Sequence, residues 1–303
     1  MALNPQTSSP SADWGNYWQG RASAGGAALV GIERNAELEV FWRHALDAAD
    51  KGSPLLDVAT GAGTVLKTAA GLGFNDLTGL DVSADALATL QRELPDVRTV
   101  VASASEPPFE ERSFATVTSQ FGLEYAGAEA AVTAIAPLLC GGGMLIAVCH
   151  LASGAIAEEV FGKLKSATAI HDSQFVPRAK SVFQASDAGF PDAAEAFRPA
   201  QDTVLAMAKR GDRLAAHLYA GTQQLHERRS AYTLADVTGW LDGMAGEIDA
   251  FMGRMQSMLD AAMSVDEAER LVASLRRMGL TAETPEILEM GGSPAALVIK
   301  ARR

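Results

Sequence analysis

The chain has 303 residues, of which 48% are hydrophobic and 20% charged, so it can bury a core and is not a disordered polypeptide. Its 25 Lys and Arg stand against 37 Asp and Glu, which gives a net charge of −12. Binding to nucleic acid requires a basic surface that displaces counterions, and the basic residues form no cluster beyond pairs such as Arg228-Arg229. We therefore expect no nucleic-acid partner.

The two cysteines, Cys140 and Cys149, lie in or beside an apolar run, which is typical of buried thiols. No disulfide framework or metal-site spacing is present, so we expect a reducing compartment and no metal. The N-terminal residues lack both a basic start and an apolar stretch of signal length. The longest apolar runs, such as 144–149, are far shorter than the roughly 20 residues of a membrane span. The sequence predicts a cytoplasmic protein that does not span a membrane.

The first half of the chain alternates between strand and helix patterns. Residues 1–12 are small and polar with two prolines, and we expect a disordered arm there. Aromatic residues at helix-like spacing follow from Asp13, and residues 34–50 form an amphipathic pattern. Short apolar runs then predict five strands, at 54–59, 77–82, 97–102, 114–119 and 144–149, with helical patterns at 64–71, 84–93 and 127–139. Alternating helices and apolar strands predict a parallel sheet with helices on both faces.

After His150 the alternation stops, and residues 153–262 read almost entirely as helix. The clearest helix starts after Thr233, a plausible N-cap with Asp236 three residues on, and presents one apolar stripe. A last helix over 265–278 precedes two runs, 281–289 and 295–301, separated by glycines and a proline, which predict a β-hairpin. We expect an α/β fold with a Rossmann-like, doubly wound, mostly parallel seven-stranded sheet, an antiparallel C-terminal hairpin and a helical cap insertion. The predicted divisions are 1–12 (arm), 13–152 (α/β core), 153–262 (insertion) and 263–303 (closing helix and hairpin).

A glycine-rich turn follows the first predicted strand. Gly61 and Gly63 allow the backbone to approach a ligand at a helix N-terminus, and Asp57 ends the strand before them. Asp81 ends the second strand, 20 residues after Gly61, where a carboxylate can accept both hydroxyls of a ribose. An alternative role for Asp81 is to cap the helix that starts near Ala84.

The details of this turn favour one adenosine cofactor over another. A dinucleotide fingerprint that starts at Gly61 requires a third glycine at position 66, which is Leu66 here. Asp57 would repel a pyrophosphate, whereas it suits a cofactor that has a free amino group and a sulfonium. The sequence therefore favours S-adenosylmethionine. Two alternatives stay open, an NAD(P)-dependent oxidoreductase and a non-catalytic S-adenosylmethionine-binding sensor or interaction protein.

Four ordered motifs resemble those of the class I S-adenosylmethionine-dependent methyltransferases, especially the small-molecule branch similar to ubiquinone-biosynthesis methyltransferases. They are LLDVATGAG at 55–63, LTGLDVS at 77–83, PPFEERSFATVTSQFGLEY at 107–125 and LLCGGGMLIAV at 138–148. The resemblance implies methyl transfer to a small, apolar or aromatic acceptor. It also implies a set of cofactor-binding residues: Asp57, Ala59, Gly61 and Gly63 around the methionine part, Asp81 with Val82 at the ribose, and Ser103, Ala104 and Gln120.

Three positions depart from the family pattern. Ser103 stands where the family often has an Asp that accepts a hydrogen bond from the adenine amino group. The hydroxyl of Ser103 or the backbone of Ala104 can accept this hydrogen bond instead. Ala115 replaces an Asp after the Phe that opens the fourth strand, and Cys140 replaces a Pro before the glycines of the fifth. None of these departures removes a group that methyl transfer needs.

The acceptor should lie beyond the carboxyl ends of the strands, because open α/β sheets bind ligands there. His150 follows the fifth strand and is the candidate general base, since histidine is the side chain most often used to accept a proton at neutral pH; the alternative is a histidine that only hydrogen-bonds a loop. Seven further residues are candidates that have ordinary packing or capping roles as alternatives. The candidates for contact with substrate are Tyr17, Trp18, Phe121, Glu124, Tyr125, Met252 and Met255.

Overall fold

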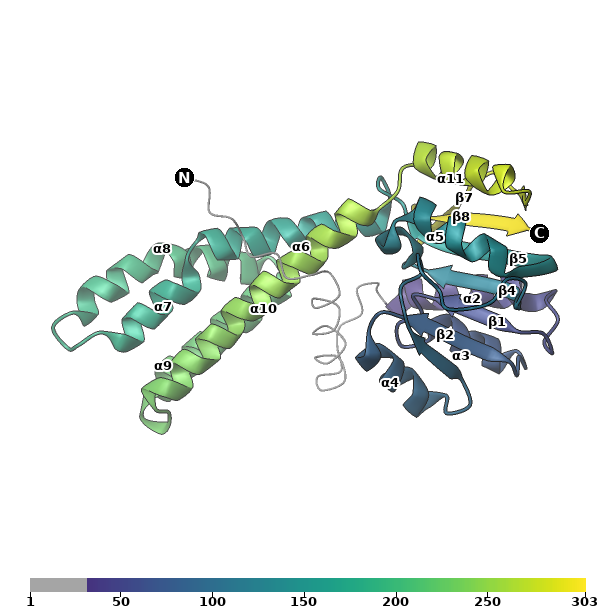
Figure 1. Ribbon diagram of the computed structural model, residues 1–303. Helices are drawn as coiled ribbons and strands as arrows, with labels where there is room; N and C mark the ends of the chain where they lie inside the picture. Colours follow the sequence, from purple (N-terminus) through teal and green to yellow (C-terminus); the bar gives the residue numbers. More distant parts are fainter. Residues whose placement is uncertain (1–31) are drawn as a thin grey trace. The chain divides into compact units, whose positions relative to one another are not determined.

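The computed structural model describes residues 32–303 (Figure 1). The predicted arm 1–12 and the candidates Tyr17 and Trp18 lie outside the described residues. The chain divides into two compact units. The sheet unit consists of the described residues up to Glu158 together with Ser257–Arg303. The helical unit is Glu159–Gln256.

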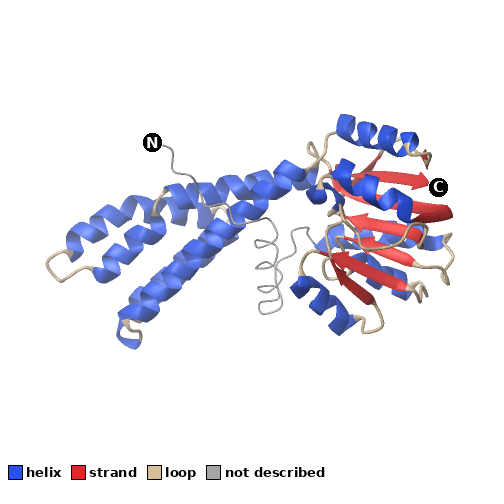
Figure 2. Cartoon of the chain, viewed as in Figure 1, coloured by secondary structure: helices blue, strands red, loops and turns tan. Residues whose placement is uncertain are grey.

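The sheet unit is built on a mixed sheet (Figure 2, red). Its strands run in the order β3-β2-β1-β4-β5-β8-β6, and β7 also pairs with β8. Strands β1 to β5 are parallel to their neighbours, and β8 is antiparallel to β5. The strand bounds are β1 Leu55–Val58, β2 Leu77–Asp81, β3 Arg98–Val101, β4 Phe114–Gln120, β5 Leu139–His150, β6 Thr281–Ala282, β7 Glu286–Met290 and β8 Ser293–Arg302. The doubly wound fold with an antiparallel C-terminal hairpin is confirmed.

The sheet has eight strands, so the prediction of seven was wrong in number. The run predicted as one strand over 281–289 is divided into β6 and β7, which pair with opposite ends of β8. Pro285 lies at the interruption and cannot donate a ladder hydrogen bond. The turn from β7 to β8 consists of Gly291 and Gly292, both with positive φ, as a tight two-residue hairpin turn requires.

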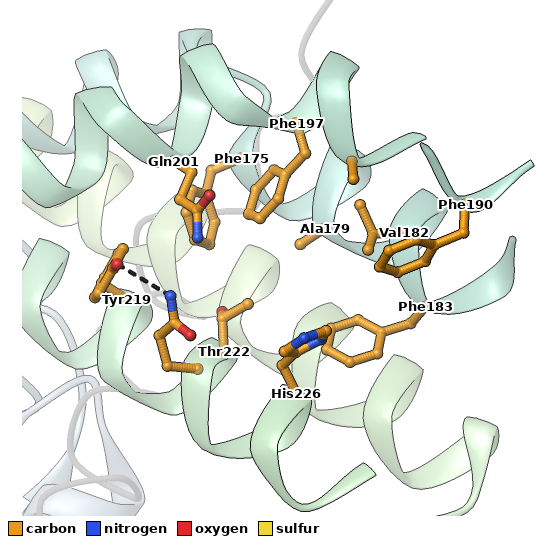
Figure 3. A pocket seen from close by; sticks show the side chains of 12 residues that line it. Phe175, Ala179, Val182, Phe183, Phe190, Phe197, Gln201, Tyr219, Thr222 and His226 are labelled. Carbon is orange, nitrogen blue, oxygen red and sulfur yellow. Dashed lines mark hydrogen bonds between the residues drawn. The ribbon is translucent and has the colours of Figure 1, made fainter. Parts of the chain in front are cut away.

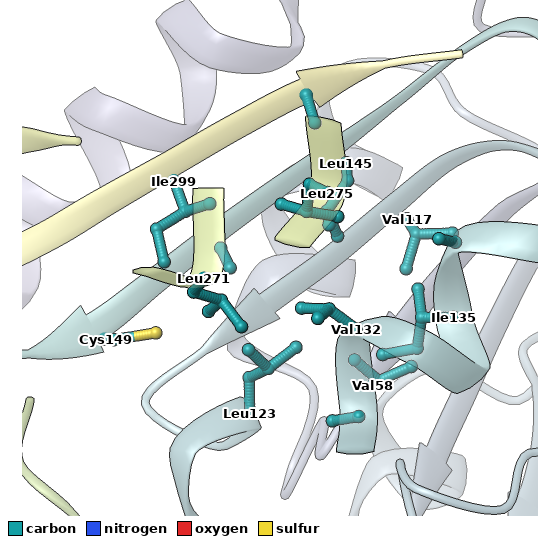
Figure 4. Close-up of a cluster of buried hydrophobic side chains, with 14 of the residues drawn as sticks. Val58, Val117, Leu123, Val132, Ile135, Leu145, Cys149, Leu271, Leu275 and Ile299 are labelled. Atoms are coloured by element: carbon teal, nitrogen blue, oxygen red, sulfur yellow. The ribbon is translucent and has the colours of Figure 1, made fainter. Parts of the chain in front are cut away.

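Helices cover both faces of the sheet (Figure 1). One face carries α2 Ile32–Asp47, α3 Thr64–Gly71 and α4 Ala84–Glu93, and the other α5 Ala128–Ile135 and α11 Val265–Arg277. On the second face, residues of α5 and α11 pack against β1, β4, β5 and β8 (Figure 4); among them are Val58, Val117, Val132, Ile135, Leu145, Leu271, Leu275 and Ile299.

Burial is uneven along the parallel strands. Every residue of β1 and β2 is buried, as expected for strands covered on both faces. β3 instead has no buried residue, and Val101 is 60% exposed. The reason is that β3 is the edge strand, and the connection from β3 to β4 contains no helix. The expectation that all five parallel strands are buried on both faces was therefore wrong for β3.

The helical unit has a core of its own, to which α7, α8, α9 and α10 contribute. Its helices are α6 Ala155–Asp172, α7 Phe175–Gln184, α8 Phe190–Lys209, α9 Arg213–Glu227 and α10 Leu234–Ala261. Thr233 and Asp236 exchange hydrogen bonds at the start of α10, which confirms the predicted cap. The unit boundaries at Glu159 and Gln256 fall inside α6 and α10. The sequence places them at 153 and 262 instead, because the helical pattern begins and ends there.

Within residues 32–303, no helix combines the length and apolar character needed to cross a bilayer. The same part of the chain contains no group of three or more His, Cys, Asp or Glu arranged to hold a metal ion.

Candidate active site

The glycine-rich turn lies between β1 and α3. Gly61 has φ 54° and Gly63 has φ 79°, in the left-handed region that glycine adopts without strain. Gly63 also precedes α3 directly, and a Cβ atom there would overlap the side chain of Leu90 in α4. The turn thus needs glycine both for its backbone conformation and for the close approach of α3 to α4.

A second turn, after β4, packs against the first. Phe121 (φ 53°) follows β4 and Ala59 (φ 52°) follows β1, and both are non-glycine residues in the left-handed region. A Cβ atom on Gly122 would overlap the Cβ of Ala59. Strain of this kind persists only where the surrounding structure enforces it, and it is common at functional sites. The carboxyl ends of β1 and β4 therefore meet in a tightly determined pair of turns.

Asp81 joins the ends of β1 and β2. Its Oδ2 accepts a hydrogen bond of 2.8 Å from the backbone N–H of Gly61, and its Oδ1 one of 2.8 Å from that of Ser83. Burial raises the pKa of Asp81, while the hydrogen bonds from Ser83, Gly61 and Val82 act in the opposite direction. Ser83, and not Asp81, caps α4, because its hydroxyl accepts from Ala86 N–H. The alternative role of Asp81 as the helix cap was wrong.

Asp57 lies one strand position from the first turn and is almost fully buried. The hydroxyls of Thr60 and Thr118 donate to its two oxygens, at 2.6 and 2.7 Å. Burial raises the pKa of Asp57 to about 7, although both threonine hydrogen bonds lower it. These threonines did not appear among the predicted site residues. The strand register, which places Thr118 beside Asp57, is the feature that brings them together.

His150 and Glu124 form a buried pair at the end of β5. Oε1 of Glu124 lies 2.8 Å from Nδ1 of His150 and accepts from the His150 backbone N–H at 3.0 Å. Phe121 stacks on the imidazole with ring centroids 4.2 Å apart, and Tyr125 approaches it edge-on at 6.1 Å. The structure therefore brings four of the predicted residues, Phe121, Glu124, Tyr125 and His150, into one cluster.

The remaining predicted cofactor residues lie at the ends of β2, β3 and β4. Val82 is 49% exposed directly after Asp81. The hydroxyl of Ser103 bonds that of Ser105 at 2.8 Å, while Ala104 is buried in the core of the sheet unit. Oε1 of Gln120 accepts from Trp42 Nε1 of α2 at 2.6 Å.

Met252 and Met255 lie on α10 in the helical unit. Met255 is fully buried and Met252 half-buried against the core of that unit. Neither residue lines a cavity that the helical unit contains, which is formed by residues of α7, α8 and α9.

Comparison with known families identifies the segment that carries these turns. A family model described as Methyltransferase domain matches residues 55–143. We refer to residues 55–143 as the methyltransferase domain, after the family model that they match. The methyltransferase domain contains Asp57, both glycine turns, Asp81 and Glu124, and it ends inside β5, before His150.

Two curated relatives share part of this domain. The demethylmenaquinone methyltransferase of Chlorobaculum tepidum is 35% identical over 69 residues, which is 23% of this chain and 28% of that protein. The protein of the same name from Renibacterium salmoninarum is 39% identical over 85 residues, 27% of this chain and 35% of its own. The match therefore spans about a third or less of the relatives' length.

Among solved structures, a SAM-dependent methyltransferase from Aquifex aeolicus aligns with 88% of this chain and 92% of its own, at 9% identity and a TM-score of 0.45. An S-adenosylmethionine-dependent methyltransferase from Mesorhizobium loti aligns with 37% of this chain and 52% of its own, at 22% identity and a TM-score of 0.35.

Proposed function

We propose that the chain transfers a methyl group from S-adenosylmethionine to a small, apolar or aromatic acceptor by in-line displacement. The observation that carries the proposal is the hydrogen bond from Gly61 to Asp81 inside the methyltransferase domain. It places a glycine turn and a buried carboxylate side by side at the carboxyl edge of β1 and β2, where open α/β sheets bind nucleotides.

The residues at this edge suit S-adenosylmethionine. Gly61 and Gly63 present backbone without side chains at the N-terminus of α3, and Asp81 offers carboxylate oxygens for ribose hydroxyls. Val82 is an exposed apolar side chain next to Asp81, suited to cover a flat base. When bound, the cofactor supplies an electrophilic methyl group on a positively charged sulfur. Ionised Asp57, held by two threonine hydroxyls, adds a negative charge behind the first turn.

His150 is proposed to take the proton from the acceptor. Because Oε1 of Glu124 already faces Nδ1, this nitrogen carries the hydrogen and Nε2 keeps its lone pair for the acceptor. Phe121 fixes the plane of the imidazole by stacking on it. Glu124 acts in this scheme through His150, as a positioning residue. Held in this way, a base and an acceptor gain the large advantage of preorganised geometry, on the order of 7 to 11 kcal/mol at best.

The proposed class of acceptor is based on the side chains around His150 and on the names of the two relatives. Phe121 and Tyr125 surround His150 with aromatic rings, which favour an apolar or aromatic molecule. The two relatives are named for demethylmenaquinone, and we extend to this chain only the coarser expectation of a small acceptor. The net charge of −12 argues against a nucleic-acid substrate.

Calorimetric titration tests the cofactor. We expect micromolar binding of S-adenosylmethionine and of its demethylated product, and no binding of NADH. The reverse result would favour the oxidoreductase alternative and reject the methyltransferase. Binding without turnover of any acceptor in a screen of phenols, hydroquinones and amines would favour the sensor.

An Asp81→Ala variant tests the residue that defines the site. We expect the dissociation constant of S-adenosylmethionine to rise about 10- to 100-fold, which corresponds to about 1.5 to 3 kcal/mol for a lost charge-assisted hydrogen bond. Asp96→Ala, at an exposed acidic position of the same unit, is the matched control and should bind as the parent does. An unchanged constant in folded Asp81→Ala protein would remove Asp81 from the cofactor site.

A further inference from the structure

The helical unit contains a cavity of its own, with a volume of ≈ 180 Å³ (Figure 3). Its walls come from α7, α8 and α9, and all its lining residues lie between Phe175 and His226. The cavity therefore lies wholly outside the methyltransferase domain at 55–143, and a ligand could bind there whether or not the chain transfers methyl groups.

Four phenylalanine rings, together with Ala179, Val182 and Ala194, form the apolar part of the wall. Phe175 and Phe183 come from α7, and Phe190 and Phe197 from α8. Phe175 and Phe197 meet edge to face with ring centroids 4.9 Å apart, and both are buried. Figure 3 shows these rings facing the residues of α9 across the cavity. Rings in such an arrangement offer both faces and edges, the two contacts that another aromatic ring prefers.

Amide and hydroxyl groups and the imidazole of His226 form the polar part of the wall. Nε2 of Gln223 donates to the hydroxyl of Tyr219 at 3.0 Å, which leaves the tyrosine proton available (Figure 3). The side-chain amide of Gln201 makes no hydrogen bond to any residue in the described part of the chain. The lining contains no Asp, Glu, Lys or Arg. Because an unpaired charge is costly to bury, the cavity suits an uncharged molecule with a hydrogen-bonding group.

The volume sets the size of that molecule. An apolar cavity of about 150 Å³ holds a benzene ring, whereas pockets for drug-sized ligands start near 300 Å³. A volume of ≈ 180 Å³ thus admits one ring with a small substituent.

From these contacts we infer that the helical unit binds an uncharged, single-ring aromatic molecule that carries a hydrogen-bonding substituent. The ring lies among the phenylalanines, and the substituent reaches Gln201 or the Tyr219–Gln223 pair. This site is distinct in sequence from every residue proposed above for the cofactor and for proton transfer.

The probe is 4-methylphenol, with toluene as its analogue without a hydroxyl, titrated calorimetrically into the full chain. We expect saturable one-to-one binding of 4-methylphenol. If the hydroxyl of 4-methylphenol bonds to Gln201, Gln201→Leu should raise the dissociation constant of 4-methylphenol about threefold or more. If it bonds to Tyr219, Tyr219→Phe should have this effect. Either variant should change the dissociation constant of toluene by less than twofold. Equal weakening of both probes by these variants would overturn the assignment of the polar contact.

Filling the cavity is the decisive variant. Ala194→Phe inserts a ring into the cavity from α8 and should raise the dissociation constant of both probes at least tenfold. Ala196→Phe, at an exposed position of the same helix outside the lining, should change it by less than twofold. If circular dichroism shows that Ala194→Phe does not fold, Val182→Phe, at a half-buried lining position, replaces it as the cavity-filling variant. Absence of saturable binding, or full binding in a folded, filled variant, would refute the site.

Discussion

Asp57 shows how burial sets the chemistry of a single residue. An acid in unfolded protein has a pKa near 3.8, and burial raises that of Asp57 to about 7. Between these values the folded state binds a proton that the unfolded state has lost. The contribution of Asp57 to stability is therefore fully present below pH 3.8 and decreases as the pH rises to about 7.

Asp57→Asn should remove this contribution. We expect the free energy of unfolding of the variant, relative to the parent, to increase as the pH rises from 4 to 7 and to stay level above 7. Urea denaturation at a series of pH values measures the difference. A difference that does not change with pH would show that Asp57 ionises normally in the folded protein.

The same residue links pH to the proposed cofactor. A group with a pKa of about 7 is about one-tenth ionised at pH 6 and about nine-tenths at pH 8. If ionised Asp57 attracts the positively charged cofactor, S-adenosylmethionine should bind up to about tenfold more tightly at pH 8 than at pH 6. In Asp57→Asn most of this pH dependence should disappear, and calorimetry at both pH values measures it. Equal pH dependence in the two proteins would exclude Asp57 as its source.

Glu124 is predicted to hold the tautomer of His150. Replacement by alanine leaves the buried Nδ1–H without its acceptor, which should cost about 1 to 3 kcal/mol of stability. The ¹⁵N shifts of the imidazole should report Nδ1–H in the parent and in Glu124→Gln, whose amide oxygen still accepts, and a changed tautomer balance in Glu124→Ala. An unaltered tautomer in Glu124→Ala would contradict the positioning role.

At the scale of elements, α10 illustrates an amphipathic stripe that serves mainly as core. Five residues predicted to lie on its apolar face are buried: Val237, Leu241, Met244, Ile248 and Met255. The stripe was predictable because residues three and four apart share one face of a helix. Which of its methionines would be fully enclosed depended on packing and could not be read from that period.

Charge substitutions on α10 separate core from surface. Met255→Lys should lower the melting temperature strongly, because Met255 is fully buried and a lysine there would leave an unpaired charge. Met252→Lys should lower it less, since Met252 is half-buried and a lysine can extend its ammonium group into water. Glu247→Lys, on the exposed face, is the control. Thermal unfolding ranks the three variants, and equal effects at positions 252 and 255 would contradict this ranking.

At the scale of the whole molecule, the division into two units predicts separable functions. The proposed cofactor residues all lie in the sheet unit. Replacing 159–256 with a short Gly/Ser linker should therefore leave the dissociation constant of S-adenosylmethionine within about threefold, because none of these residues is removed. Calorimetry measures the dissociation constant. Loss of binding by a folded shortened chain would contradict the assignment of the cofactor site to the sheet unit alone.

The sequence by itself determined the elements and the first half of the site. The pairing of Gly61 with Asp81 followed from the spacing of 20 residues between a glycine turn and an acid at the end of the next strand. Four other features follow from local rules of periodicity, capping and turn geometry: the alternating strands and helices, the bounds of α3 and α4, the cap at Thr233 and the hairpin turn at Gly291-Gly292. These signals act over a few residues and are therefore legible in the chain.

Only the tertiary structure decided which distant residues meet. Local patterns do not relate the residues that form three of the contacts described above. These are the hydrogen bond of Thr118 with Asp57, the hydrogen bond of Glu124 with His150, and the cavity of phenylalanines among α7, α8 and α9. The exposure of β3 was likewise decided by its place at the edge of the sheet. The physical reason is that burial and long-range hydrogen bonds depend on strand register and helix packing, which the whole fold determines at once.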